Sequence, residues 1–320
     1  MDFEIKDLAG VSEPLKKFIE VVSAGIGACY RPRGMRNEAD SHAYAIKAIA
    51  AAEAEAEEIK RIAQANGQIA SITALAGENP GLIERARVRL VMREIEGQRN
   101  IEAIAENALP LLPETVSDKP VSDDWRRKFF LEAENICDKD LQLLWGKVLA
   151  GEVASPGSYG LRTLEVLKHL SKEEAEFFRQ ACAIAFEDGW IMKPAVDPSR
   201  GLQPYGLDYD ALLVLRDAGL LFDGDTLIKD GTNWANVPSV ILANNGIYMQ
   251  ISGPHLQGQQ IPSLPFTRAG RELQNLLPPN PCMPFLQAVA GYFRARGLTV
   301  KKGKFGSSGG VTGMSFEEDF

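Results

Sequence analysis

The sequence predicts an α+β protein that is mainly α-helical, and three observations support this fold class. Apolar residues recur at helical spacing through most of the first 187 positions, together with alanine- and glutamate-rich segments. After Asp188 and Gly189 the pattern changes to short runs of β-type residues separated by turns. The chain has 320 residues, of which 45% are hydrophobic, and this is enough for a buried core.

We expect four parts along the chain. The first is an N-terminal helical arm, the second a central helical bundle, the third a winged-helix-like α+β domain and the fourth a flexible acidic tail rich in glycine and serine. Their predicted ranges are 1–78, 79–188, 189–304 and 305–320.

The N-terminal arm is predicted to be helical from Leu15 to about Ala76. Its first part has apolar residues at helical spacing, and the part after Glu38 is rich in alanine and glutamate, which are strong helix formers. The second part has only a thin apolar stripe, and isolated helices take most of their stability from packing. We therefore expect the arm to mediate self-association. The stripe consists of Ile46, Ile49, Ile59 and Ile62.

The central bundle is predicted from several short helices joined by tight loops. Ser122 is expected to cap one of these helices, and Ser171 and Glu174 are expected to form a capping box at the start of another. A segment from Leu82 to about Leu109 has five arginines up to position 99, but glutamates lie among them. This pattern favours a salt-bridged, solvated helix face over a phosphate-binding track. Four aromatic residues at helical spacing are expected in the core. They are Trp125, Phe129, Phe130 and Trp145.

The third part has the order helix, helix, two strands, helix, which is typical of a winged-helix module. A helix is predicted from Asp208 to Ala218, and strands are predicted on both sides of the turn at 244–246. A short strand then leads into a helix that Thr267 caps. A last helix at 284–296 and a strand at 298–301 follow.

Charge is distributed unevenly along the chain. The net charge of −8 excludes nucleic acid or an anionic membrane as an electrostatic partner of the protein as a whole. Near the C-terminus, however, seven basic residues accompany a single acid, and they form a candidate surface for phosphate or non-specific nucleic-acid binding. The alternative is a solvated edge that keeps the last strand from pairing with another chain. These residues are Arg268, Arg271, Arg294, Arg296, Lys301, Lys302 and Lys304.

Two further segments suggest contacts. Residues 231–267 contain no charged side chain, which fits either an interface or a buried β-hairpin. At the front of the chain, basic residues bracket an apolar segment, and this suggests a partner contact or a peripheral membrane contact. Packing on the protein's own core is the alternative. The residues proposed for this contact are Lys16, Lys17, Phe18, Arg31 and Arg33.

The common catalytic and metal-binding patterns are missing. The three histidines are isolated, and the four cysteines form no CxxC pair. We therefore expect no catalytic residue, no metal and no cofactor, and we predict that the protein is not an enzyme. A nuclease built from Asp223, Asp225 and Lys229 stays a weaker possibility, because the Asp-Gly turn explains these residues more simply. The chain shows no signal peptide and no apolar run long enough for a membrane span, and we expect a cytoplasmic protein.

One group of motifs has a family resemblance. Asp123-Asp124-Trp125, Leu144-Trp145-Gly146-Lys147, Gln98-Arg99-Asn100-Ile101 and Gly25-Ile26-Gly27 together resemble a bacterial family of uncharacterised function. The Trp-centred helix and the helix at 167–174 are similar to a module of abortive-infection proteins of the alpha type. This resemblance implies a place among phage-defence genes.

From this resemblance we predict a non-enzymatic component of bacterial antiphage defence that acts through self-assembly or through a protein partner. The alternative is a winged-helix DNA-binding regulator. Against this alternative, the helix at 208–218 has three aspartates and one arginine, whereas a helix that binds DNA is expected to be basic.

Overall fold

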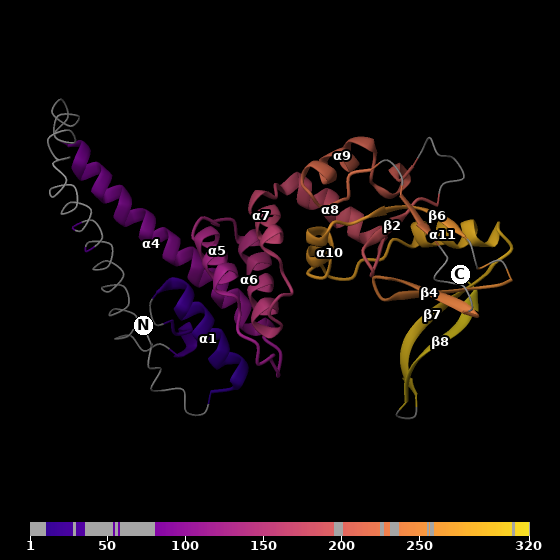
Figure 1. The fold of residues 1–320 in the computed structure, drawn as a ribbon, viewed down its shortest axis with the longest axis horizontal. Helices are drawn as coiled ribbons and strands as arrows, with labels where there is room; N and C mark the ends of the chain where they lie inside the picture. Colours follow the sequence, from indigo (N-terminus) through magenta and orange to yellow (C-terminus); the bar gives the residue numbers. More distant parts are fainter. Residues whose placement is uncertain are drawn as a thin grey trace. The chain divides into compact units, whose positions relative to one another are not determined.

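The computed structural model confirms an α+β protein that is mainly helical, and it divides the chain into two compact units, Met1–Tyr159 and Gly160–Phe320 (Figure 1). The predicted division into four parts differs from this result, because the helices after residue 160 belong to the second unit. The structure describes residues 11–27, 30–35, 54, 57, 81–194, 201–224, 227–230, 237–254, 256, 259–308 and 311–319.

The first unit is helical in its described residues. Helix α1 packs on α5 and α6, and the long helix α4 packs on the same two helices. The predicted capping residue of α5, Ser122, occupies the N-cap position, but its side chain makes no capping hydrogen bond. Asp138 caps α6 by accepting hydrogen bonds from two backbone N–H groups. The elements are α1 (Glu13–Ile26), η1 (Arg33–Met35), α4 (Leu82–Ala108), η2 (Leu109–Leu111), α5 (Asp123–Ala133) and α6 (Lys139–Ala154).

The predicted aromatic core is confirmed. Phe129 lies at its centre, stacked on Trp125 with 4.8 Å between ring centroids and tilted against Trp145 at 5.1 Å. All three rings are buried, and Phe130 joins them from the same helix. This cluster holds α5 and α6 together and gives the unit its core.

The predicted N-terminal arm is wrong for its first part. Phe18, Ile19 and Val22 of α1 are fully buried, because the apolar face of α1 completes the core made by α5 and α6. Helix α1 is therefore part of the bundle and not a separate arm. In the predicted alanine-rich helix only residues 54 and 57 are described, both in helical conformation, and the rest of it lies outside the described residues.

The second unit contains helices and two four-stranded sheets. The strand orders are β1-β2-β6-β3 and β4-β5-β7-β8, and all neighbouring strands run antiparallel. The helices are α7 (Leu161–His169), α8 (Lys172–Ile184), α9 (Tyr209–Asp217), α10 (Arg268–Gln274) and α11 (Met283–Arg294), with η3 at Gln203–Tyr205. The strands are β1 (Ala185–Phe186), β2 (Trp190–Met192), β3 (Leu227–Asp230), β4 (Ser239–Asn244), β5 (Ile247–Ser252), β6 (Gln260–Pro265), β7 (Thr299–Ser308) and β8 (Val311–Asp319).

Local sequence signals for this unit are confirmed. Ser171 and Glu174 form the predicted capping box of α8, and the Thr267 hydroxyl accepts a hydrogen bond from the backbone N–H of Gly270 at 3.1 Å. The β4–β5 hairpin turns at Asn245 and Gly246, which have φ angles of 49° and 81°. Within the uncharged segment, Met249 and Ile251 of this hairpin are fully buried, which favours the buried hairpin over an interface.

Helices α7 and α8 were predicted in the central bundle, and this boundary is corrected. The Glu272 carboxylate of α10 accepts hydrogen bonds from the backbone N–H of Gly160 at 2.7 Å and from the Thr163 hydroxyl. Phe178 of α8 packs against Phe266, with 5.6 Å between ring centroids. Contacts far apart in the sequence therefore tie both helices to the sheet-containing unit.

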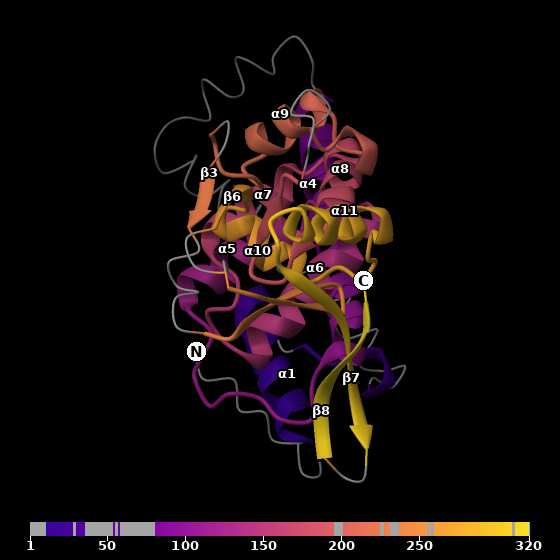
Figure 2. The ribbon, with the colours of Figure 1, turned by 90° about the vertical axis from the view of Figure 1, so that its right-hand side faces the viewer.

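The predicted flexible tail is also wrong, because residues 311–319 form strand β8, which pairs with β7 in a long hairpin (Figure 2). Valine, threonine and phenylalanine at positions 311, 312 and 316 favour a strand. The register places Lys301 opposite Asp319 and Lys302 opposite Glu318, so positions of opposite charge face one another across the strands. The tail thus extends the second sheet.

Candidate functional site

The structure separates the residues predicted for a membrane or partner contact. Phe18 is fully buried and meets Tyr30 edge-on, with 6.2 Å between centroids, so it is not available at the surface and this prediction is wrong for Phe18. The Lys17 ammonium donates to the Ser117 carbonyl at 2.6 Å, and Lys16 pairs with Glu13 at 2.9 Å.

The alternative reading of this segment, packing on the protein's own core, is confirmed for α1. Arg31 and Arg33 are exposed beyond the end of the helix, and the backbone N–H of Arg33 donates to the Glu106 carboxylate at 2.8 Å. Among the described residues, no helix is both long and apolar enough to cross a membrane.

The seven basic residues predicted as one surface lie in two places. Arg268 and Arg271 lie on α10, and the others lie on α11, just after it, or on β7; Figure 1 shows α10 and α11 apart. Arg268 pairs with Glu272 at 2.7 Å, which offsets its charge. The Arg296 guanidinium lies 3.4 Å from the centroid of the Tyr292 ring. The structure therefore does not bring these seven residues together, and β8, rather than β7, forms the edge of the sheet.

The buried carboxylates among the described residues have structural roles, because they bind backbone N–H groups or pair with a lysine. Glu152 is 2% exposed and accepts hydrogen bonds from the backbone N–H groups of Gly157 at 2.7 Å and Tyr159 at 3.0 Å. Glu132 pairs with Lys128 at 3.1 Å.

Across the part of the chain that the structure describes, no group of three or more potential metal ligands is present. Asp225, one of the three residues of the nuclease hypothesis, lies outside the described residues.

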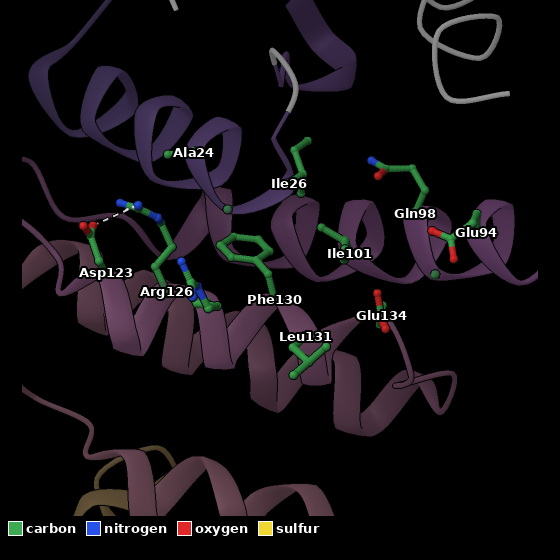
Figure 3. Close-up of a pocket in the computed structure, with 13 residues that line it drawn as sticks. Ala24, Ile26, Glu94, Gln98, Ile101, Asp123, Arg126, Phe130, Leu131 and Glu134 are labelled. Atoms are coloured by element: carbon green, nitrogen blue, oxygen red, sulfur yellow. Dashed lines mark ion pairs between the residues drawn. The ribbon is translucent and has the colours of Figure 1, made fainter. Parts of the chain in front are cut away.

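A pocket of about 420 Å³ lies where α1, α4 and α5 meet (Figure 3). Helix α1 can come this close because Gly25 lies directly on the Phe130 ring, and any Cβ at this position would collide with it. Gly27 then ends the helix with a φ of 67°, a conformation that favours glycine. The Gly25-Ile26-Gly27 motif thus shapes one wall of the pocket.

A polar network fixes the opposite wall. The Asn100 side-chain amide donates to the Glu134 carbonyl at 2.8 Å, and the Gln142 amide donates to the Asn100 side-chain oxygen at 3.2 Å and to the Ile136 carbonyl at 2.8 Å. These bonds tie α4 to the connection between α5 and α6. They give a structural role to Asn100 in the Gln98-Arg99-Asn100 motif.

The two ends of the pocket differ in charge. Arg126 lies at one end and pairs with Asp123 at 2.8 Å, whereas Glu94 and Glu134 lie at the other end, beyond Phe130 and Ile101 (Figure 3). Burial raises the pKa of the Glu134 carboxyl above its ordinary value, and the nearby charge of Glu94 raises it further. The acidic end therefore disfavours a second negative charge.

This raised pKa predicts a pH-dependent effect of Glu134→Gln. The folded protein binds the Glu134 proton more tightly than the unfolded chain, so Glu134 lowers stability once the pH rises above the ordinary glutamate pKa. We expect Glu134→Gln to raise the melting temperature at pH 7 and to have no such effect below pH 4. Thermal melts across this range test the prediction, with the exposed Glu96→Gln on α4 as the control. A stabilisation that is the same at both pH values would contradict it.

The residues of this pocket come from three helices that are distant in the sequence, and sequence analysis did not identify it. It also missed an apolar stripe on α4, formed by Val88, Val91, Met92 and Ile95. The signal was present, because these residues follow the helical spacing i, i+3, i+4, i+7. Because arginines lie between these apolar residues, the segment was interpreted as a salt-bridged, solvated helix face.

Comparison with known proteins identifies a family but no characterised relative. No curated protein and no solved structure matches the chain. The model of the family described as "Protein of unknown function (DUF2806)" matches residues 84–290, which include α4 and most of the second unit. This agrees with the predicted membership in an uncharacterised family. With well over half of its length matched, the chain belongs to the DUF2806 family.

Proposed function

We propose that the protein is a non-enzymatic component of bacterial antiphage defence that acts by assembly, in the first place with a second copy of itself. The link to defence rests on the resemblance to abortive-infection proteins of the alpha type. The assembly function rests on one observation, the exposed apolar stripe on the projecting half of α4.

The projecting half of α4 extends beyond α5 and α6 (Figure 1). Residues 85–89 are all exposed, so none of the elements that the structure describes buries a side of the helix there. Within the stripe, Val88 is 49% exposed and Met92 is 57% exposed, while Val91 and Ile95 are half-buried. A helix without packing is marginally stable in water, so a partner surface would stabilise this half.

The stripe is suited to a second copy of the same helix. If two α4 helices pair antiparallel about a centre between positions 91 and 92, Val88 lies opposite Ile95 and Val91 lies opposite Met92. A single twofold axis thus places apolar residues of one helix opposite apolar residues of the other, as an isologous interface requires.

The second unit supports protein contacts more than DNA binding. The strands predicted for the winged helix, β4 and β5, lie in the second sheet with β7 and β8. Between α9 and α10, β3 and β6 pair antiparallel in the first sheet, and this pair supports a winged-helix-like module. In such a module α9 would be the recognition helix, yet it begins at the N-cap Asp208 and exposes Tyr209 and Leu213. Because winged-helix domains also bind proteins, this surface favours a protein contact.

Phage challenge of bacteria that express the protein tests the proposal. We expect the wild-type protein to lower the plating efficiency of at least one phage in a broad panel. The double variant Val88→Asp/Met92→Asp should plate like the empty vector, because two charges in the stripe prevent pairing. The control is Ala86→Asp/Arg89→Asp on other sides of the same helix, which should protect like wild type. Full protection by the stripe variant at equal expression would overturn the assembly mechanism.

A further inference from the structure

The pocket between α1, α4 and α5 is not used in the proposed assembly. On α4, Glu94, Gln98 and Ile101 line the pocket, whereas the residues of the α4 stripe are not part of its lining. The pocket volume of about 420 Å³ falls within the usual range for ligand sites. The pocket therefore needs a role other than assembly.

The order of residues along α5 places positive charge at one end of the pocket and negative charge at the other. Arg126 and Arg127 lie near its start, Phe130 and Leu131 one turn later, and Glu134 directly after its end. Glu134 lies eight positions after Arg126, so the cationic and anionic ends are about 12 Å apart along the helix axis. An extended peptide spans this distance with about three to four residues.

The middle of the pocket is apolar and open to a ligand. Phe130 and Ile101 form its floor, and Leu131 is 56% exposed at its rim. An exposed leucine next to a buried aromatic ring provides an apolar surface that a side chain of a ligand can cover. A ligand must therefore combine an apolar centre with charged ends.

The charged groups at both ends are accessible. Arg127 lines the pocket and is exposed. Glu94 has an ion pair with Arg93 at 3.1 Å, but both side chains are solvated, and such a pair is weak enough for a ligand to replace it. Because the charge of Glu94 acts on the partly buried Glu134, a cation placed between these two carboxylates would be stabilised by both.

We propose that this pocket binds an extended segment of a partner polypeptide that has an acidic side chain, an apolar side chain and a basic side chain in that order or its reverse. The acidic group lies at Arg126 and Arg127, the apolar side chain packs on the exposed Leu131, and the basic group lies between Glu94 and Glu134. Nucleic acid does not fit, because the carboxylates repel phosphate. A metal ion does not fit either, because the two glutamates are separated from further carboxylates by Gln98 and the apolar floor.

Calorimetric titration of the full-length protein with blocked peptides tests this site. The probe is acetyl-Glu-Leu-Ala-Arg-amide, together with versions that have one or three residues between the charged ones. The control peptides replace either the glutamate or the arginine with glutamine. We expect the probe to bind and each control peptide to bind about fivefold more weakly, as expected for the loss of one solvated ion pair.

Protein variants identify the site. Arg127→Glu and Glu94→Lys should each weaken binding of the probe by about tenfold, while Arg89→Glu and Glu96→Lys, which lie outside the pocket on α4, should leave it unchanged. Arg127, Arg89 and Glu96 are exposed and the Glu94 side chain is 39% exposed, so the variants should fold, and thermal melting verifies this. Absence of binding by every peptide in the series would overturn the proposal. Binding that is equal in the wild type and the two pocket variants would overturn it too.

Discussion

Replacing Trp145 with alanine is expected to lower the free energy of unfolding of the first unit by about 3 to 5 kcal/mol. Among the described residues, Trp145 is the largest side chain that is fully buried, and it packs against Phe129. Its indole N–H has no hydrogen-bond partner among the described residues, so the loss comes from packing and from the cavity that alanine leaves. Chemical denaturation followed by hydrogen exchange in α5 and α6 measures the effect.

The control for this variant lies on the same helix. Leu143 is 51% exposed on α6, and Leu143→Ala should change the free energy of unfolding by less than about 0.5 kcal/mol. Because the second unit is compact by itself, its amides should keep their protection in Trp145→Ala. Equal destabilisation by the two alanine variants would contradict the assigned core.

The second large effect is expected for Gly270→Ala in the second unit. A Cβ at position 270 would collide with the backbone carbonyl oxygen of Leu220 and would lie 3.1 Å from the Cβ of Phe266. The carbonyl cannot move easily, because it accepts a hydrogen bond from the backbone N–H of Thr267 at 3.0 Å. We expect the free energy of unfolding to fall by about 3 kcal/mol, which is at the upper end of the range for overpacked sites. Chemical denaturation of this unit measures the effect.

Gly291→Ala is the matched control. Gly291 lies within α11, and a Cβ there would have no atom within 4 Å. Since alanine favours a helix over glycine, this variant should gain about 0.5 to 1 kcal/mol. If Gly270→Ala were as stable as Gly291→Ala, the close approach of α10 to Leu220 would be wrong.

Sequence patterns predicted the features that depend on neighbouring residues. The capping box at Ser171, the cap at Thr267 and the turn at Asn245-Gly246 are local signals, and the structure confirms all three. The aromatic core was also predictable, because helical spacing places Trp125 and Phe129 on one face.

Features that depend on distant contacts were not predictable in this way. The boundary between the units depends on a contact between residues more than 100 positions apart. The Glu272 carboxylate accepts a hydrogen bond from the backbone N–H of Gly160, at the start of α7, and so ties this helix to the second unit. Strand β8 depends on its register with β7, whereas its glycine and serine content suggested a linker. The pocket requires Gly25, Gln98 and Glu134 to meet, and no spacing rule relates positions on three separate helices.

Light scattering of the purified full-length protein tests the proposed assembly through α4 most directly. One chain has a mass of 35.0 kDa. We predict the mass of two chains for the wild type and for Ala86→Asp/Arg89→Asp, and the mass of one chain for Val88→Asp/Met92→Asp at the same concentration. A wild-type mass of one chain, or an unchanged assembly in the Val88→Asp/Met92→Asp variant, would contradict self-assembly through the α4 stripe.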